Sequence, residues 1–228
     1  MRRLLRASST VLIVAGALMI ADAGITLAWQ EPVSAVMARL AQNRLAGELE
    51  EIEHAQPTAV QRRALASLPS QRRRIAFLAR AARRDAATGE PIGRIEIPSI
   101  GADFVVVQGT DGATLRKGPG HYPDTSFPGL GATVAVAGHR TTYLAPFRKV
   151  DQLRAGDEIE LEMPYGRFAY AVQRTRIVPP SALWVTRDVG YERLVLSACH
   201  PLYSAAERIV VFARLRRVEP RGAAVGRS

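Results

Sequence analysis

Cysteine is nearly absent from this chain of 228 residues, because the only one is Cys199, at the end of the apolar run 194–199. A single cysteine cannot form an intrachain disulfide, so cross-linking does not stabilise the fold. The thiol is therefore either a small buried hydrophobic group or a reagent. The chain also lacks Cys-x-x-Cys and His-x-x-x-His pairs. We therefore predict neither a metal site nor a cofactor.

Aromatic residues are scarce where positive charge is dense. The net charge is +10, and residues 61–90 carry eight arginines against Asp85 and Glu90. A strongly basic protein can bind nucleic acid or an anionic membrane surface. Binding of single-stranded nucleic acid also uses aromatic side chains on which bases stack, and these are nearly missing from the arginine-rich segment. We therefore predict no nucleic-acid partner.

Charge is almost missing from residues 7–30, which contain Asp22 and no other charged residue. About 20 apolar residues are enough for a membrane-spanning helix. Arg2, Arg3 and Arg6 precede the segment, so the positive-inside bias predicts a cytoplasmic N-terminus and an extracellular remainder. We predict that residues 1–30 are a cytoplasmic tip with a single-pass signal anchor in the cell membrane. The alternative is a signal peptide cleaved near residues 21–23.

Glycine is nearly absent from residues 31–90, which are rich in Ala, Leu, Arg, Glu and Gln. These are good helix formers, so the segment predicts a helical stalk or linker. Pro57 and Pro69 interrupt it, and Thr58 and Ser70 are suited to cap the helices that follow. We take it as a solvated helical spacer. Its acidic first part and basic second part could instead pair as a hairpin, or the basic part could rest on anionic lipid headgroups.

From residue 91 the pattern changes to short runs in which apolar and polar residues alternate. Such runs occur at 94–97, 158–162, 168–178, 193–198 and 209–215, and Gly- and Pro-containing turns separate them. Residues 112–117 and 145–153 are expected to form short helices. The pattern predicts a mainly β domain, a barrel or sandwich, over residues 91–217. The polar residues 218–228 predict a disordered tail.

Three residues at strand ends have the chemistry for acyl transfer. Cys199 is a nucleophile, and a neighbouring cation would raise its thiolate fraction. His139 follows the apolar strand 131–138 and can return a proton to an amine leaving group. Arg208 precedes the strand 209–213 and can bind a carbonyl or oxyanion. Spacing alone is weak evidence, since a buried thiol, a turn histidine and a surface arginine explain the same residues.

The surrounding sequence is more specific. The segment GPGHYPDTSFPGLGATVAVAGHRTTYLAPF (118–147) is followed by LVLSACHPLYSAAERIVVFARL (194–215). Together they resemble the sortase transpeptidases, and most closely the class E sortases of actinobacteria. One residue departs from the family pattern, because Ala198 stands where the family usually has Thr before the cysteine.

The resemblance implies an eight-stranded sortase β-barrel with short helices, in which Cys199, His139 and Arg208 are catalytic. It implies cleavage of a C-terminal LAxTG- or LPxTG-like sorting signal between Thr and Gly on a secreted protein. The acyl group would be held as a thioester and passed to an amine of a peptidoglycan precursor or another acceptor. Tyr122 and Thr142 would bind substrate, and no cofactor would be needed.

Other interpretations fit less well. A papain-like protease has its cysteine before its histidine, which is the reverse of the order here. An L,D-transpeptidase would have a Ser-His-Gly-Cys type of turn, which is missing. A membrane-tethered module that binds an extended peptide without reaction remains the alternative function. His200 is a poorer partner for Cys199 than His139, because neighbouring residues on a strand face opposite sides.

Overall fold

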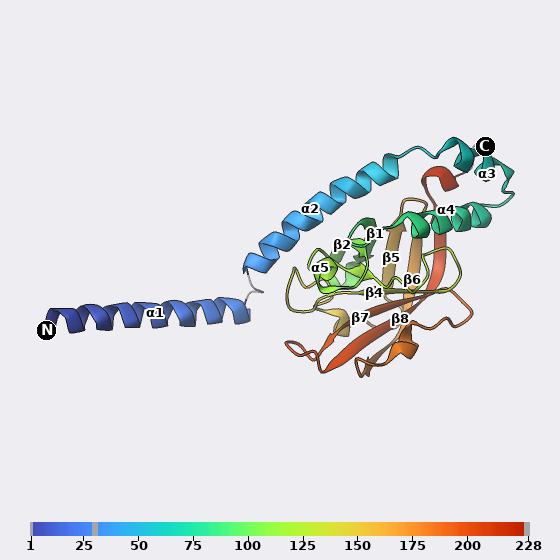
Figure 1. Ribbon diagram of the computed structural model, residues 1–228. Helices are drawn as coiled ribbons and strands as arrows, with labels where there is room; N and C mark the ends of the chain where they lie inside the picture. The colour runs from blue at the N-terminus through green and yellow to red at the C-terminus, as the bar shows by residue number, and fades with distance from the viewer. Residues whose placement is uncertain (1, 29–31, 226–228) are drawn as a thin grey trace.

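The computed structural model describes residues 2–28 and 32–225. Four helices come first (Figure 1): α1 Arg2–Ala28, α2 Pro32–His54, α3 Ala59–Ser67 and α4 Gln71–Asp85. Thr58 forms a capping box with Gln61, and the Ser70 side chain accepts from the backbone N–H of Arg73. These contacts satisfy N–H groups that lack a partner in the first turn of a helix. The predicted caps of α3 and α4 are thus confirmed.

The rest of the chain forms a closed barrel of eight strands with the neighbour order β1-β2-β3-β4-β7-β8-β6-β5. The strands are β1 Pro91–Ile97, β2 Ala102–Gln108, β3 Gly120–His121, β4 Thr133–Ala137, β5 Glu158–Met163, β6 Gly166–Val178, β7 Arg193–His200 and β8 Glu207–Pro220. Short helices lie between them: α5 Gly112–Leu115, η1 Pro98–Ile100, η2 Val150–Gln152 and η3 Leu183–Thr186. The expected eight-stranded barrel with short helices is confirmed.

Both faces of the strands around β7 are apolar, which explains the weak alternation of this sequence. Leu194, Leu196 and Ala198 belong to the main cluster inside the barrel, with residues of β1, β5, β6 and β8. Val195 belongs to a second cluster on the outer face, with Ala135 of β4 and with residues of β8 and of the β6–β7 connection. Residues of β7 with odd numbers therefore face outward at this part of the barrel.

The helical segment packs against the barrel and is not a solvated spacer. Leu45 and Leu49 of α2 form a buried cluster with Val105 and Val107 of β2. The Gln42 side chain donates to the backbone oxygen of Val105 (3.1 Å) and accepts from its N–H (2.8 Å), so it continues the β2 edge. One face of α4 also enters the core, as its members Ile75 and Ala79 show. The leucines and alanines that favour helix formation thus supply core contacts as well.

The C-terminal segment is ordered further than the sequence predicts. Strand β8 continues to Pro220 and pairs its last residues with Gly166, Arg167 and Phe168. A short helix η4, Gly222–Ala224, follows, and Ala224 is fully buried in the main core cluster. The expectation of disorder from residue 218 is therefore wrong for residues 218–225, because this apolar contact fixes them. Residues 226–228 lie outside the described residues.

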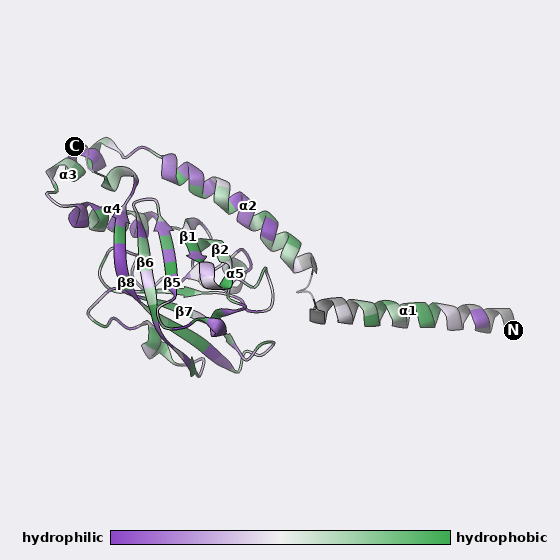
Figure 2. Cartoon of the chain, turned by 180° about the vertical axis from the view of Figure 1, so that it is seen from behind, coloured by the Kyte–Doolittle hydropathy of each residue, from purple (hydrophilic) through white to green (hydrophobic). Residues whose placement is uncertain are grey.

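Helix α1 is continuous over the segment for which we predicted a membrane anchor (Figure 2). No helix in the described part of the chain is both long and apolar enough to be counted as a membrane span. Residues 29 and 30 of the expected anchor lie outside the described residues.

Candidate active site

Cys199 is the second-last residue of β7, and its thiol is free and half-buried. Pro201 follows the strand and has no backbone N–H, so it cannot donate to a ladder. The cysteine therefore lies where a rigid strand meets a loop, and is accessible from solvent. This position suits a reacting group better than a packing residue.

The strand register brings His139 and Arg208 to the level of Cys199. Strand β4 runs parallel to β7, with Ala137 paired with Ser197, and the N–H of Gly138 donates to the Ser197 oxygen over 3.0 Å. His139 is two residues beyond Ala137, as Cys199 is beyond Ser197. On the other side, antiparallel β8 places Arg208 directly opposite Cys199. The three residues thus lie on three neighbouring strands at one end of the barrel.

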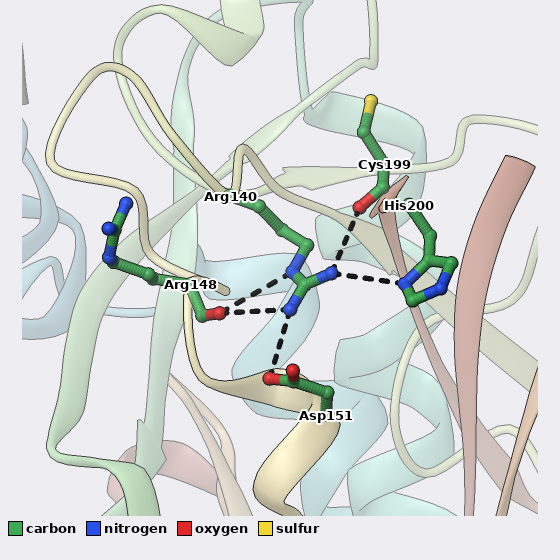
Figure 3. Close-up of polar contacts among 5 residues, drawn as sticks. All are labelled: Arg140, Arg148, Asp151, Cys199 and His200. Carbon is green, nitrogen blue, oxygen red and sulfur yellow. Dashed lines mark hydrogen bonds and ion pairs between the residues drawn. The ribbon is translucent and has the colours of Figure 1, made fainter. Parts of the chain in front are cut away.

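Strand alternation places Cys199 and Arg208 on the same face of the sheet. Cys199 alternates with the outward-facing Val195, and Arg208 alternates with Val210, which belongs to the same outer cluster. His139 lies two residues beyond the end of β4, at the same level of the barrel. Figure 3 shows the Cys199 thiol pointing away from His200, whose ring contacts Arg140 instead. The structure therefore pairs Cys199 with Arg208, brings the segment that carries His139 to the same end of the barrel, and leaves His200 on the other side of the strand.

The environment of His139 favours a neutral imidazole. Burial first, and the positive charge of Arg116 second, lower the pKa of His139. Its Nε2 atom is buried and has no hydrogen-bond partner among the described residues. The Tyr143 ring lies 5.2 Å from the imidazole, between centroids, and contributes to this burial. We expected a protonated ring beside the thiol, whereas this site favours a ring that is ready to accept a proton.

Arg208 is held by the turn between β7 and β8. Its Nη1 atom donates to the backbone oxygens of Ala205 and Glu207, each over 2.9 Å. Its Nε and Nη2 atoms make no hydrogen bond within the described ranges 2–28 and 32–225. A guanidinium fixed at one corner can thus present its remaining donors to a carbonyl oxygen near Cys199.

Comparison with known proteins identifies this arrangement. The sortase domain model matches residues 95–216, which is the barrel from β1 into β8. The chain belongs to the sortase family. Sortase D of Bacillus subtilis is 34% identical over 131 residues, which are 56% of this chain and 65% of the relative. The chain thus spans less than two thirds of that relative's length.

Solved sortase structures have the same fold. Sortase E of Streptomyces avermitilis is 33% identical, with a TM-score of 0.54, over 59% of this chain and 93% of the other. A sortase D5 transpeptidase of Clostridium perfringens has a TM-score of 0.63 over 78% of this chain and 99% of the other. Its 21% identity supports the fold alone. Relatives of more than one class match, so the family is shown but the class is not.

The two predicted substrate-binding residues flank the sortase site differently. Tyr122 packs against the outer apolar cluster, and its N–H donates to the Ala135 oxygen over 2.9 Å. It therefore lies on the face that carries Cys199. Thr142 is half-buried in the loop after His139, where its backbone oxygen accepts from the N–H of Ala145 (2.8 Å). The structure places both near the proposed site but does not assign them a ligand.

Ala198, which stands where the family usually has Thr, has an apolar environment. It is 3% exposed, lies in the main core cluster of the sortase barrel and pairs with Ile209 of β8. Its methyl group points into the barrel, away from the face that carries Cys199. The substitution therefore changes core packing beneath the nucleophile and not the reacting face.

Sequence reasoning missed two buried polar residues of the sortase site. His121 is 1% exposed, with Nδ1 2.9 Å from the Gln108 amide and Nε2 2.9 Å from the Ser126 oxygen. Burial lowers the pKa of His121 to about 4. Arg140, 2% exposed, contacts the end of β7. No signal in the sequence marks Arg140 as buried.

No group of three His, Cys, Asp or Glu residues in the described chain is arranged to hold a metal ion.

Proposed function

We propose that this sortase is a cysteine transpeptidase that cleaves a C-terminal sorting signal between Thr and Gly. Cys199 Sγ attacks the Thr carbonyl carbon, the Thr–Gly bond breaks, and a thioester forms. The glycine amine leaves with a proton. An amine acceptor then attacks the thioester, forms a new amide bond and returns the thiol. The register that places Arg208 opposite Cys199 and brings the segment with His139 to the same end of the barrel supports this proposal.

Each side chain has a separate role in this scheme. The neutral His139 takes the thiol proton and gives it to the leaving amine. Arg208 donates its free N–H groups to the oxyanion of the tetrahedral intermediate. A serine protease uses backbone N–H groups for that purpose. Here the direct cross-strand pairing of Arg208 with Cys199 offers a side chain instead.

The outer apolar cluster supports the face that would bind the signal peptide. Val195 and Phe212 are already buried beneath η3, where Trp184 stacks on Phe212 with centroids 6.2 Å apart. The exposed side chains of Leu183 and Trp184 in η3 are the apolar surface that an extended peptide on this face could cover. We infer an LAxTG-like signal and a class E enzyme, with Tyr122 and Thr142 contacting the signal. The 33% identity to a solved sortase E supports this class, and the 34% identity to a sortase D is the competing assignment.

We further propose that α1 anchors the enzyme in the cell membrane, with the barrel outside and the N-terminus in the cytoplasm. Supporting this, Val11, Leu12 and Ile13 are each 67–71% exposed and therefore need an apolar environment. The substrates would be secreted proteins with sorting signals, and the acceptor an amine of a peptidoglycan precursor. Membrane fractionation and protease protection of full-length protein in cells test this topology. Recovery in the soluble fraction would contradict it.

Peptide cleavage by the full chain in detergent tests the enzymatic proposal. A Leu-Ala-x-Thr-Gly peptide should be cleaved after Thr, and added glycine or diaminopimelate amines should appear in the product mass. Cys199→Ala should abolish cleavage while peptide binding persists. Ser197→Ala is the matched control, two residues away on the same face of β7, and should retain cleavage. Continued turnover by Cys199→Ala would refute the nucleophile.

A further inference from the structure

Arg140 is a buried cation with contacts to three separate segments of the chain. Nη1 donates to the Cys199 oxygen (3.4 Å) and lies 3.2 Å from His200 Nδ1 (Figure 3). Nε and Nη2 donate to the Arg148 oxygen at 3.4 and 3.2 Å. Nη2 also forms an ion pair with Asp151 Oδ1 at 2.9 Å. The guanidinium thus joins the end of β4, the loop that leads into η2, and the end of β7.

This burial is costly unless every donor is used. A guanidinium removed from water must be paired and hydrogen-bonded to be tolerated. Its one ion-pair partner among the described residues, Asp151, has a side chain that is 44% exposed. A packing role alone would be met by an apolar side chain at lower cost. The five contacts therefore indicate that this position requires the planar, hydrogen-bonding shape of a guanidinium.

Arg140 is the neighbour of the proposed base in the chain. It follows His139 directly, in the segment just beyond β4. The Arg140 guanidinium donates to the Cys199 carbonyl oxygen. One backbone segment thus connects the proposed base to the proposed nucleophile.

The same contact orients the ring of His200. A guanidinium can only donate, so Nδ1 of His200 accepts from Arg140. The His200 ring is therefore held against Arg140 and away from the thiol. This explains its position next to Cys199 without a chemical role.

We propose that Arg140 is a positioning residue for transpeptidation. It holds the end of β7 so that the Cys199 thiol stays level with His139. Together with Asp151 it forms a charge-balanced pair beneath the thiol. The positioning of Cys199 relative to His139 rests on the proposed function. The charge balance between Arg140 and Asp151 can be measured on the free thiol without turnover.

The decisive experiment is the pH profile of Cys199 alkylation by a methanethiosulfonate, with full-length protein in detergent. Arg140→Gln leaves the Asp151 carboxylate unbalanced and should move the midpoint to higher pH. Asp151→Asn leaves the Arg140 cation unbalanced and should move it to lower pH. Both shifts should be measurable at low salt, because each variant leaves one unit charge unbalanced near the thiol, and both should shrink at high salt.

The opposite directions of the two midpoint shifts separate the proposed role from a general loss of structure. Unfolding would move the alkylation midpoint of both variants in the same direction. The other titratable and charged groups near this end of β7, from His139, His200, Glu207 and Arg208, are present in both variants. Arg193→Gln is the matched control. Arg193 is also buried in this sheet, at the other end of β7, and donates to the Val185 and Arg187 oxygens, each over 2.9 Å. It should leave the profile unchanged.

Turnover provides the second readout. Arg140→Gln should lower kcat for peptide cleavage by about 10- to 100-fold with little change in KM, since a small displacement of reacting groups has this effect. Arg140→Lys keeps the charge but not the planar fork, so it should restore part of kcat and a near-normal alkylation profile. Shifts of equal sign, no shift in Asp151→Asn, or full kcat in Arg140→Gln would each overturn the proposal. If Arg140→Gln does not fold, the isosteric Asp151→Asn decides. Absence of cleavage by the wild type would refute the proposed function and leave the alkylation test intact.

Discussion

Acid should destabilise this sortase through His121, the buried histidine of β3. Burial lowers its pKa from 6.5 to about 4, so the folded state favours the neutral ring. Between these values the unfolded chain binds a proton that the folded chain does not. The stabilising contribution is therefore complete above pH 6.5 and is lost as the pH falls through 4. At about 1.4 kcal/mol per pH unit, the loss is about 3 kcal/mol.

The geometry of the network suggests the variant for this test. The Ser126 atom that faces Nε2 of His121 is the backbone carbonyl oxygen, which can only accept, so Nε2 donates to it. The side-chain oxygen of Gln108 faces Nδ1. His121→Gln keeps a donor for Ser126 and removes the titration. Urea unfolding of wild type and variant at intervals from pH 7.5 to 4 measures the difference in the free energy of unfolding. The wild type should lose about 3 kcal/mol more than the variant over this range. Parallel curves would refute the reasoning.

Three further predictions concern the surroundings of the site. Arg116→Gln removes a cation that lowers the pKa of His139, so the limb of the kcat/KM pH profile due to His139 should move to higher pH. High salt should reduce this difference between variant and wild type. An unchanged limb at low salt would contradict the prediction. Leu45→Ala in α2 should lower the free energy of unfolding by about 3 kcal/mol, because its side chain fills the contact with β2; a negligible loss would mean that α2 is not docked. Gly138→Ala would place a Cβ 2.5 Å from the Phe147 ring, so it should lower the free energy of unfolding by about 1–3 kcal/mol. It should also lower kcat, because His139 is the next residue. Wild-type stability by calorimetry together with wild-type cleavage would argue against this packing.

The strands could be predicted from the sequence because period-two alternation is a local property. The five alternating runs lie within β1, β5, β6, β7 and β8. The short strand β3, Gly120–His121, has no such pattern, because two residues cannot show a period. Its place between β2 and β4 depends on tertiary pairing that only the folded chain defines.

The candidate site was predictable in composition but not in arrangement. The order of His139, Cys199 and Arg208 is visible in the sequence, whereas their position at the same end of the barrel depends on the register of β4, β7 and β8. The Arg140 network was not predictable, since a single sequence does not reveal that a charged side chain is buried. Docking of α2 was missed for a related reason, because its apolar positions identify a face but not its partner.

The most direct test of the central claim is intact-mass measurement of the enzyme during reaction with a Leu-Ala-x-Thr-Gly peptide without added amine. We predict a mass increase equal to the peptide up to Thr, located on Cys199 by fragmentation and removed by hydroxylamine, as expected for a thioester. Cleavage of the peptide without an adduct on Cys199, or with an adduct on another residue, would contradict the account.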